Sequence, residues 1–355
     1  MFNSDNLNAD EALFEAQKIA FAPIIFQSAK LLVDWGVFEL LHKNRNGLSI
    51  EEISTTLQLP AYAVKIVCES GYSMSALKFS NEKYFLTKIG YFLFTDEMTK
   101  VNMNFNNDVN YQGLFYLDES LLKNKPVGLH KTFDTNEETI YPILSKLPQK
   151  AKKSWFEFDH FYSDAAFKEL ISFMSKRNVK KLLEPGGNTG KWAIGITKAT
   201  KDTSVTILDH QGQIDVAMQN AKANNVQDRV DAIAMDLLDH SIAFPKNYDG
   251  VWMSQFLDCF SPSDIIELIK RSKEALNDNG RVYILEPFWD RQSHKIGSYC
   301  LINTSPYFSA LANGTSKMYR ATEMISFVNK AGLEVEEEIN GFGFGHTLLV
   351  CKNKD

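Results

Sequence analysis

Hydrophobic positions recur with two different periods along the chain, and the period changes near residue 179. Up to that point apolar residues follow helical spacing, interrupted by two strand-like runs at 76–79 and 84–87 around a polar turn. Beyond it, short apolar runs predict strands at 179–183, 205–208, 230–234, 250–253 and 282–285. Between the strands lie helical stretches at 190–199, 213–224 and 262–276. This alternation predicts an α/β fold with a parallel sheet that helices cover on both faces.

The first hundred residues have the pattern of a winged helix. Gly36 divides the helical stretch at 11–41 into two pieces, Ser49 and the acids after it open a short helix, and Pro60 begins another. The two strand-like runs that follow form the wing.

Winged helices often bind DNA, but they also serve in dimerisation or in covering a substrate. The charge of this region distinguishes these functions. Residues 1–110 contain 9 Lys and Arg against 13 Asp and Glu, and the candidate recognition helix at 60–73 offers only Lys65 beside Glu69. A surface that contacts phosphates needs clustered cations. We therefore expect dimerisation or the covering of a substrate, and no nucleic acid.

The rest of the chain predicts two further parts. Residues 101–175 are rich in aromatic residues and predict a helical connector. The chain closes with a helix at 323–331 and strands at 334–339 and 346–351, and the link between these strands is too short for a crossover helix. They should therefore pair antiparallel at one edge of the sheet. The predicted domains are 1–100, 101–175 and 176–355.

Composition excludes several classes of protein. The chain has 355 residues, a formal net charge of −6 and 44% hydrophobic residues, which is typical of a globular protein that does not coat anionic surfaces. Its four cysteines and seven histidines lack the spacing of a metal site, so we expect no metal. Residues 1–15 contain no Lys or Arg, and the apolar run at 19–26 is too short to span a bilayer. We expect a cytoplasmic protein without membrane contact.

A glycine-rich turn at 185–190 follows the first predicted strand. Glycines at such a turn let the backbone approach a ligand closely. A Walker A loop would need other residues in place of Pro185 and Trp192, and a dinucleotide fingerprint would need Gly in place of Asn188 and Lys191. Both nucleotide motifs are therefore excluded by their spacing.

Acidic residues follow the next two strands. Asp209 ends the second strand, where a carboxylate can accept both ribose hydroxyls, and Asp236 follows the third, where it can meet an adenine edge or cap a turn. Each acid alone could equally be a helix cap or a solvated turn residue. Together with the glycine turn they fit an adenosyl ligand that has no pyrophosphate.

This combination resembles the class I S-adenosylmethionine-dependent methyltransferases, and nearly the whole chain is similar to the plant-type O-methyltransferase family, in its bacterial small-molecule branch. The segments that carry the resemblance keep the family's order and spacing: 35–41, 47–53, 84–90, 182–190, 229–238, 276–282 and 330–333. The resemblance implies a Rossmann-like seven-stranded sheet, an N-terminal winged-helix dimerisation domain and a connector that lines the acceptor pocket. It also implies a homodimer in which the N-terminal helices of one subunit close the pocket of the other.

The resemblance assigns residues to two ligands. It implies that S-adenosylmethionine, whose product is S-adenosylhomocysteine, is bound without a metal by Gly186, Gly187, Asp209, Asp236, Leu237, Ser254 and Gln255. For the acceptor we expect a pocket of aromatic and apolar side chains that suit a flat molecule, namely Phe158, Tyr162, Phe256 and Met318, with Phe288, Tyr307 and Phe308.

The catalytic positions depart from the family's pattern. Where the family has a His that takes the acceptor's proton, this chain has Asp258. The first supporting Glu is retained as Glu286, but the second falls near Met318, which cannot orient a base.

Three explanations are open. Burial could raise the pKa of Asp258 toward neutrality and make it the base, or the acceptor could be acidic enough for positioning to suffice. Alternatively, the acceptor is not a hydroxyl, or the chain is not catalytic. Asp258 could also merely cap the helix that begins at Pro262, and three histidines from other segments are spare candidates: His160, His294 and His346.

These features predict methyl transfer from S-adenosylmethionine to a small aromatic acceptor, on a hydroxyl oxygen. One alternative is an enzyme of the same fold that methylates nitrogen or carbon. The other is a non-catalytic regulator that binds S-adenosylmethionine and uses the winged helix on DNA. The acidic N-terminal region argues against the regulator, whereas the missing His argues for it.

Overall fold

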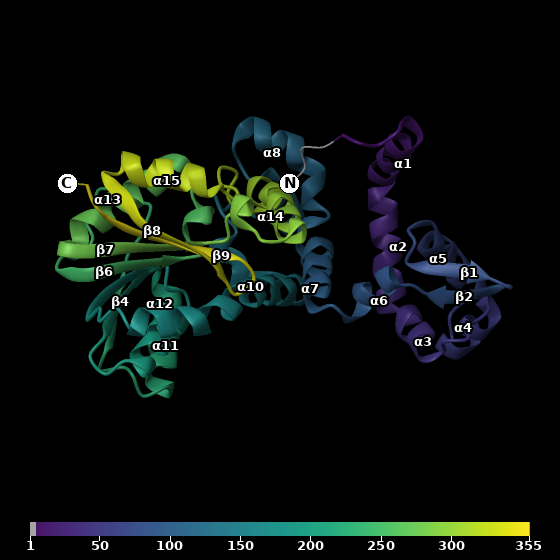
Figure 1. The fold of residues 1–355 in the computed structure, drawn as a ribbon, viewed down its shortest axis with the longest axis horizontal. Helices are drawn as coiled ribbons and strands as arrows, with labels where there is room; N and C mark the ends of the chain where they lie inside the picture. The colour runs from purple at the N-terminus through teal and green to yellow at the C-terminus, as the bar shows by residue number, and fades with distance from the viewer. Residues whose placement is uncertain (1–4, 355) are drawn as a thin grey trace. The chain divides into compact units, whose positions relative to one another are not determined.

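A computed structural model describes residues 5–354, and the chain divides into two compact units, Met1–Asp108 and Val109–Asp355 (Figure 1). Each unit has its own hydrophobic core. No helix within residues 5–354 is both long and apolar enough to cross a bilayer.

The first unit consists of short helices and a two-stranded hairpin. Its elements are α1 (Ala9–Ala20), α2 (Ala22–Asp34), α3 (Val37–Lys43), α4 (Ile50–Leu57), α5 (Ala61–Ser73), β1 (Leu77–Ser80), β2 (Lys83–Leu86), α6 (Lys88–Thr95) and α7 (Glu97–Phe105). The predicted hairpin is confirmed, with Leu77 paired to Leu86. The predicted start of α4 is also confirmed, since Ser49 and Glu52 form a capping box there.

The helical stretch before residue 43 has one more break than the sequence predicted. Gly36 separates α2 from α3 at a φ of +76°, as expected. A second break falls at Phe21, and Pro23 lies in the first turn of α2. Proline has no backbone N–H to donate, which suits it to the start of a helix. Residues 9–43 therefore form three helices rather than two.

The second unit begins with helices that pack against a later part of the chain. The early elements are η1 (Asn106–Asn110), which crosses the boundary between the units, η2 (Gly113–Tyr116), α8 (Leu117–Lys123), α9 (Val127–Phe133), η3 (Tyr141–Lys146) and α10 (Gln149–Ser175). The later elements are η5 (Trp289–Arg291), α14 (Lys295–Tyr307) and η6 (Phe308–Ala312). The Ile140 N–H donates to the Ala312 carbonyl at 2.8 Å. A Cβ on Gly128 would lie only 2.7 Å from the Ala310 carbonyl oxygen, so α9 and η6 approach closely.

The seven-stranded sheet has the order β5-β4-β3-β6-β7-β9-β8. Its strands are β3 (Lys181–Pro185), β4 (Ser204–Asp209), β5 (Val230–Ala234), β6 (Tyr248–Ser254), β7 (Leu276–Glu286), β8 (Leu333–Phe342) and β9 (His346–Asn353). The first five strands in chain order are parallel, whereas β9 is antiparallel to both β7 and β8. The predicted α/β fold and its antiparallel final pair at one edge are confirmed.

Helices cover both faces of this sheet (Figure 1). On one face, residues of α10, α11 (Lys191–Ala199) and α12 (Gln211–Ala223) pack with Trp252 and Leu285. On the other face, residues of α13 (Pro262–Ala275) and α15 (Ala321–Lys330) pack with Met253 and Ile284. Neighbouring residues of one strand thus enter opposite cores, as the alternation of a pleated strand requires.

Candidate functional site

Polar residues gather where four neighbouring parallel strands end. Glu184 lies near the end of β3, while Asp209, Ser254 and Glu286 are the last residues of β4, β6 and β7. Because these strands are adjacent and parallel, their carboxyl ends meet at one edge of the sheet. This edge is the candidate site.

The glycine-rich turn connects β3 to α11 at this edge. Gly186 has a φ of +71°, and a Cβ there would lie 2.3 Å from the Phe256 ring. A Cβ on Gly187 would lie 2.7 Å from the Ile207 side chain. A side chain at either position would force its neighbour to move, so the glycines let the turn pack closely against Phe256 and Ile207.

Two acidic side chains lie beside the turn. The Asp209 carboxylate accepts hydrogen bonds from the backbone N–H groups of Asn188 at 2.9 Å and His210 at 2.7 Å. Burial nevertheless raises its pKa, and these bonds offset only part of that effect. Glu184 is also buried, and burial together with the Asp209 charge raises its pKa well above the usual value. Its Oε2 atom has no hydrogen-bond partner among the described residues.

The other residues expected at the cofactor lie on the neighbouring strand ends. Asp236 follows β5, and its Oδ1 accepts from the Leu238 N–H at 2.9 Å. Leu237 is buried in the core that also contains Phe256. Gln255 follows Ser254 at a φ of +45°, donates its N–H to the Leu285 carbonyl, and keeps Oε1 buried without a partner in residues 5–354.

These residues suit an adenosyl ligand. Its hydroxyl and amino groups donate hydrogen bonds, and the buried Glu184 and Gln255 oxygens lack donors. A buried acceptor without a partner is costly, so a donor-rich ligand at this edge would relieve both.

A short 3₁₀ turn, η4 (Leu257–Cys259), carries Asp258 at the same edge. Glu286 holds its start, because Oε1 accepts from the backbone N–H groups of Phe256 at 3.0 Å and Leu257 at 2.8 Å. The Asn313 side chain holds its end by donating to the Cys259 carbonyl at 2.7 Å. The backbone around Asp258 is therefore fixed on both sides.

Asp258 and Glu286 line one small cavity, which has no room for a water molecule in this conformation, together with Pro287, Phe288, Met318, Tyr319 and Met324. Asp258 and Glu286 are 7% and 1% exposed as whole residues. Asp258 does not cap the following helix, because the Ser261 side chain accepts from the Asp264 N–H and is the cap of α13. The capping alternative for Asp258 is therefore excluded.

The electrostatics of this cavity favour neutral carboxyl groups. Burial raises the pKa of Asp258 to about 7, the nearby Asp159 charge adds to the shift, and a contact with the Cys259 thiol opposes it. The pKa of Glu286 is raised well above its usual value by burial and by Asp258. On α10, burial raises the pKa of Asp159 to about 6. Asp258 thus titrates near neutral pH, where a proton acceptor is most effective.

The aromatic residues expected at the acceptor pocket fall into separate groups. Phe288 and Met318 line the cavity of Asp258, and Phe256 packs against Phe260 with ring centroids 4.7 Å apart. Phe158 and Tyr162 pack against each other on α10, and neither lines that cavity. The remaining two expected aromatics, Tyr307 and Phe308, are buried and in contact, with ring centroids 5.2 Å apart.

None of the three spare histidines lines the cavity of Asp258. His160 and His294 are exposed, whereas His346 is buried at the start of β9. Burial lowers the pKa of His346 to about 4, so this ring is neutral at physiological pH.

Sequence reasoning missed three residues of this edge. Glu184 directly precedes the glycine-rich turn, so its place near the end of an apolar strand could have marked it. Asp159 and Asn313 come from distant segments and join Asp258 only in the folded chain. No spacing rule connects residues so far apart.

The fold and this edge define a class of protein. Residues 158–338, about half of the chain, match the family described as "Methyltransferase domain", and residues 14–84 match "Dimerisation2-like domain". The chain belongs to the methyltransferase domain family and is an S-adenosylmethionine-dependent methyltransferase. The expected resemblance to the plant-type O-methyltransferases is confirmed by these two domains in this order and by the fold.

Individual relatives extend the comparison over most of the chain. An L-tyrosine C(3)-methyltransferase of Streptomyces lavendulae is 25% identical over 321 residues, which cover 90% of this chain and 86% of that protein. The apo structure of the S-adenosylmethionine-dependent methyltransferase SibL superposes with a TM-score of 0.70 at 21% identity, covering 95% and 98% of the two chains. A neocarzinostatin-biosynthesis O-methyltransferase, solved with S-adenosylmethionine and a hydroxynaphthoic acid, superposes with a TM-score of 0.67 at 15% identity, covering 93% and 96%.

Proposed function

We propose that this enzyme methylates the hydroxyl oxygen of a small phenolic acceptor, with Asp258 as the proton acceptor. One observation carries the proposal: a carboxyl group whose pKa is raised to about 7 stands in a cavity at the position where the resembled family has its basic His. A carboxyl group with a pKa near the working pH is partly ionised, so it can accept a proton, and it binds that proton more tightly than an ordinary carboxylate does.

Asp258 acts on the acceptor's proton. When bound, S-adenosylmethionine supplies a methyl group made electrophilic by its sulfonium. The phenolic O–H bond breaks as its proton passes to an Asp258 oxygen, and the oxygen's electron pair forms the bond to methyl while the carbon–sulfur bond breaks. Glu286 and Asn313 hold η4 by its backbone, so Asp258 meets the acceptor in one position.

We assign the cofactor's contacts to the neighbouring strand ends. Asp209 accepts the ribose hydroxyls, Asp236 and Leu237 flank the adenine, and the backbone of Gly186 and Gly187 lies against the amino-acid part. The unpartnered oxygens of Gln255 and Glu184 accept hydrogen bonds from the ammonium or hydroxyl groups of the cofactor. Ser254 lies beside them. Calorimetry with S-adenosylhomocysteine on Asp209→Ala tests the assignment, which is wrong if the variant binds as tightly as the wild type.

A second candidate reaction is methylation of a ring carbon. Loss of the phenolic proton places negative charge on the oxygen and on the ortho carbon, so the same base serves both reactions. The relative that matches over most of this chain is named for methylating carbon 3 of L-tyrosine. If carbon is the target, the ring hydrogen must leave as a proton after transfer. The product's NMR spectrum separates an O-methyl from a C-methyl group.

We also propose that the enzyme is a homodimer formed through its first unit. No residue of α1 is buried, and its large apolar side chains Leu13, Phe14 and Ile19 are exposed, as is Ile24 in the first turn of α2. Such a surface favours a second copy as its cover. Phe14→Asp should shift the sedimentation of the protein from dimer to monomer. An unchanged sedimentation coefficient contradicts this interface.

Turnover with phenols of different acidity tests the proposed base. Asp258→Asn should lower kcat for phenols of pKa near 10 by about a hundredfold or more, because they need a base. At about pH 8, nitrophenols of pKa near 7 are largely ionised without a base and should lose less than about tenfold. An equal loss for both classes excludes Asp258 as the base. Turnover of amines or enols with none of phenols overturns the acceptor class.

A further inference from the structure

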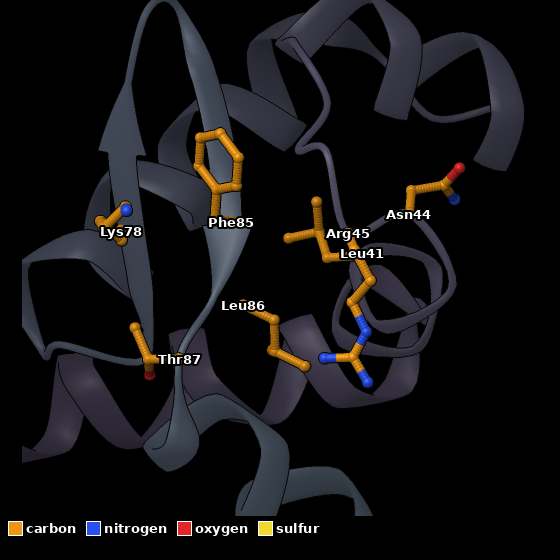
Figure 2. A pocket seen from close by; sticks show the side chains of 7 residues that line it. All are labelled: Leu41, Asn44, Arg45, Lys78, Phe85, Leu86 and Thr87. Atoms are coloured by element: carbon orange, nitrogen blue, oxygen red, sulfur yellow. The ribbon is translucent and has the colours of Figure 1, made fainter.

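The first unit contains a hollow of about 340 Å³ between the end of α3 and the hairpin β1–β2 (Figure 2). Its lining residues are Leu41, Asn44, Arg45, Lys78, Phe85, Leu86 and Thr87. Figure 2 shows the apolar side chains of Phe85 and Leu86 between Lys78 and Arg45. The hollow thus has an apolar floor, two cations and no acid in its lining. We call it the cationic hollow.

Within residues 5–354, neither cation of the hollow is neutralised by an acid. Five of its nine Lys and Arg residues form ion pairs, namely Lys18, Lys30, Lys43, Lys65 and Lys83. Arg45 and Lys78 form no ion pair among the described residues, although the unit has an excess of acids. Lys78 Nζ instead lies 5.2 Å from the centroid of the Phe85 ring. Both cations line the same hollow, so an anion bound there would be attracted by both of them.

The walls of the cationic hollow are joined to each other. Leu48 and Tyr84 exchange backbone hydrogen bonds at 3.1 and 2.8 Å, which ties the loop after Arg45 to the hairpin. A Cβ on Gly47 would lie 2.7 Å from the Phe85 ring, so the loop packs directly on the floor. The hollow is therefore formed before any ligand arrives, and little ordering opposes binding.

We propose that the cationic hollow is a binding site for a small carboxylate with an apolar body, such as an aromatic acid. The Arg45 guanidinium presents a planar fork that matches a carboxylate, and Lys78 adds a second positive charge. The floor of Leu41, Phe85 and Leu86 suits an apolar ring and offers nothing to a hydrated inorganic anion. Its volume lies in the range of small-molecule pockets. Nothing in this proposal depends on the methyl-transfer site.

Fluorine NMR on the full chain tests the site with 4-fluorobenzoate as the probe. The neutral 4-fluorobenzamide measures the contribution of the ring alone, and inorganic phosphate measures that of charge alone. The test variant is Arg45→Gln/Lys78→Gln. The matched control is Lys88→Gln/Lys100→Gln, which removes the same charge from two exposed lysines of the same unit that form no ion pair in residues 5–354. Matching thermal midpoints establish that both variants are folded.

We expect 4-fluorobenzoate to bind the wild type and the control variant with equal affinity. It should bind the test variant with about tenfold lower affinity. The benzamide should not bind, and added NaCl should weaken the benzoate. Equal binding by both variants places the benzoate elsewhere and overturns the proposal, as does the absence of binding at millimolar concentration. Competition by phosphate at equal strength overturns the requirement for an apolar body.

Discussion

Replacing Asp258 by Asn should stabilise the folded protein at alkaline pH while it abolishes the proposed base. Asp258 is 7% exposed as a whole residue, and burial raises the pKa of its carboxyl group from 3.8 to about 7. An unfolded chain exposes the same group to water. In the folded chain at high pH, Asp258 is therefore a buried negative charge whose cost Asn does not carry.

The sign and size follow from linkage. Well below the unfolded pKa of 3.8 the group is protonated in both states and costs nothing. As pH rises from about 4 to about 7, only the unfolded state ionises, so the free energy of unfolding falls by about 1.4 kcal/mol per pH unit. The cost is about 2 kcal/mol at pH 5 and about 4 kcal/mol above pH 7. The stability difference between variant and wild type should therefore grow by about 2 to 3 kcal/mol between pH 5 and pH 8.5.

Urea unfolding of both proteins at pH 5.0 and 8.5 measures this difference. Asp278→Asn is the control, because Asp278 is exposed and its carboxylate is solvated in both states. The control should show no change with pH. A stability difference for Asp258→Asn that is the same at both pH values refutes the reasoning, since the charge would then carry no cost in the fold.

Three further substitutions test separate features. Gly186→Ala places a Cβ 2.3 Å from the Phe256 ring at a positive φ, so it should lower both the melting temperature and the affinity for S-adenosylhomocysteine. An affinity that calorimetry finds unchanged contradicts the proposed approach of this backbone to the cofactor. Asn313→Ala removes the bond to the Cys259 carbonyl and should lower kcat about tenfold without changing cofactor affinity, and an unchanged kcat shows that η4 needs no such support. Ser261→Ala removes the cap of α13 and should cost about 1 kcal/mol in urea unfolding, with turnover as the check that the site is intact.

The parts of the fold that depend on local pattern could be predicted from the sequence. Strand–helix alternation marks the central strands, the short link at 341–345 marks the antiparallel edge, and the capping pair at Ser49 marks a helix start. The break at Phe21 was missed because the apolar spacing continues through it and Pro23 stands inside an otherwise helical pattern. Local pattern decides which element forms, but tertiary packing decides where a long helix divides.

The candidate site was predictable only where its residues stand at strand ends. The positions of Gly186, Asp209 and Glu286 follow from counting along strands that share one edge. Asp159 approaches from a long helix, and Asn313 from the residues after a π-helix, so their relation to Asp258 depends on how those helices pack. The raised pKa of Asp258 likewise comes from burial, which no spacing in the sequence states.

The position of β9 inside the sheet has a consequence for synthesis on the ribosome. β8 is translated before β9, and β9 is its only neighbour in the sheet, so an interval passes before β8 has a partner. For that interval β8 is an unpaired strand with nowhere to bind. Its sequence carries Glu at 334, 336, 337 and 338, and strings of like charge deter an edge from pairing with another chain. In the finished fold all four of these carboxylates form ion pairs, with Lys352, Arg281, Arg177 and Arg291 in that order, so the charges that protect the unpaired strand later hold it in place.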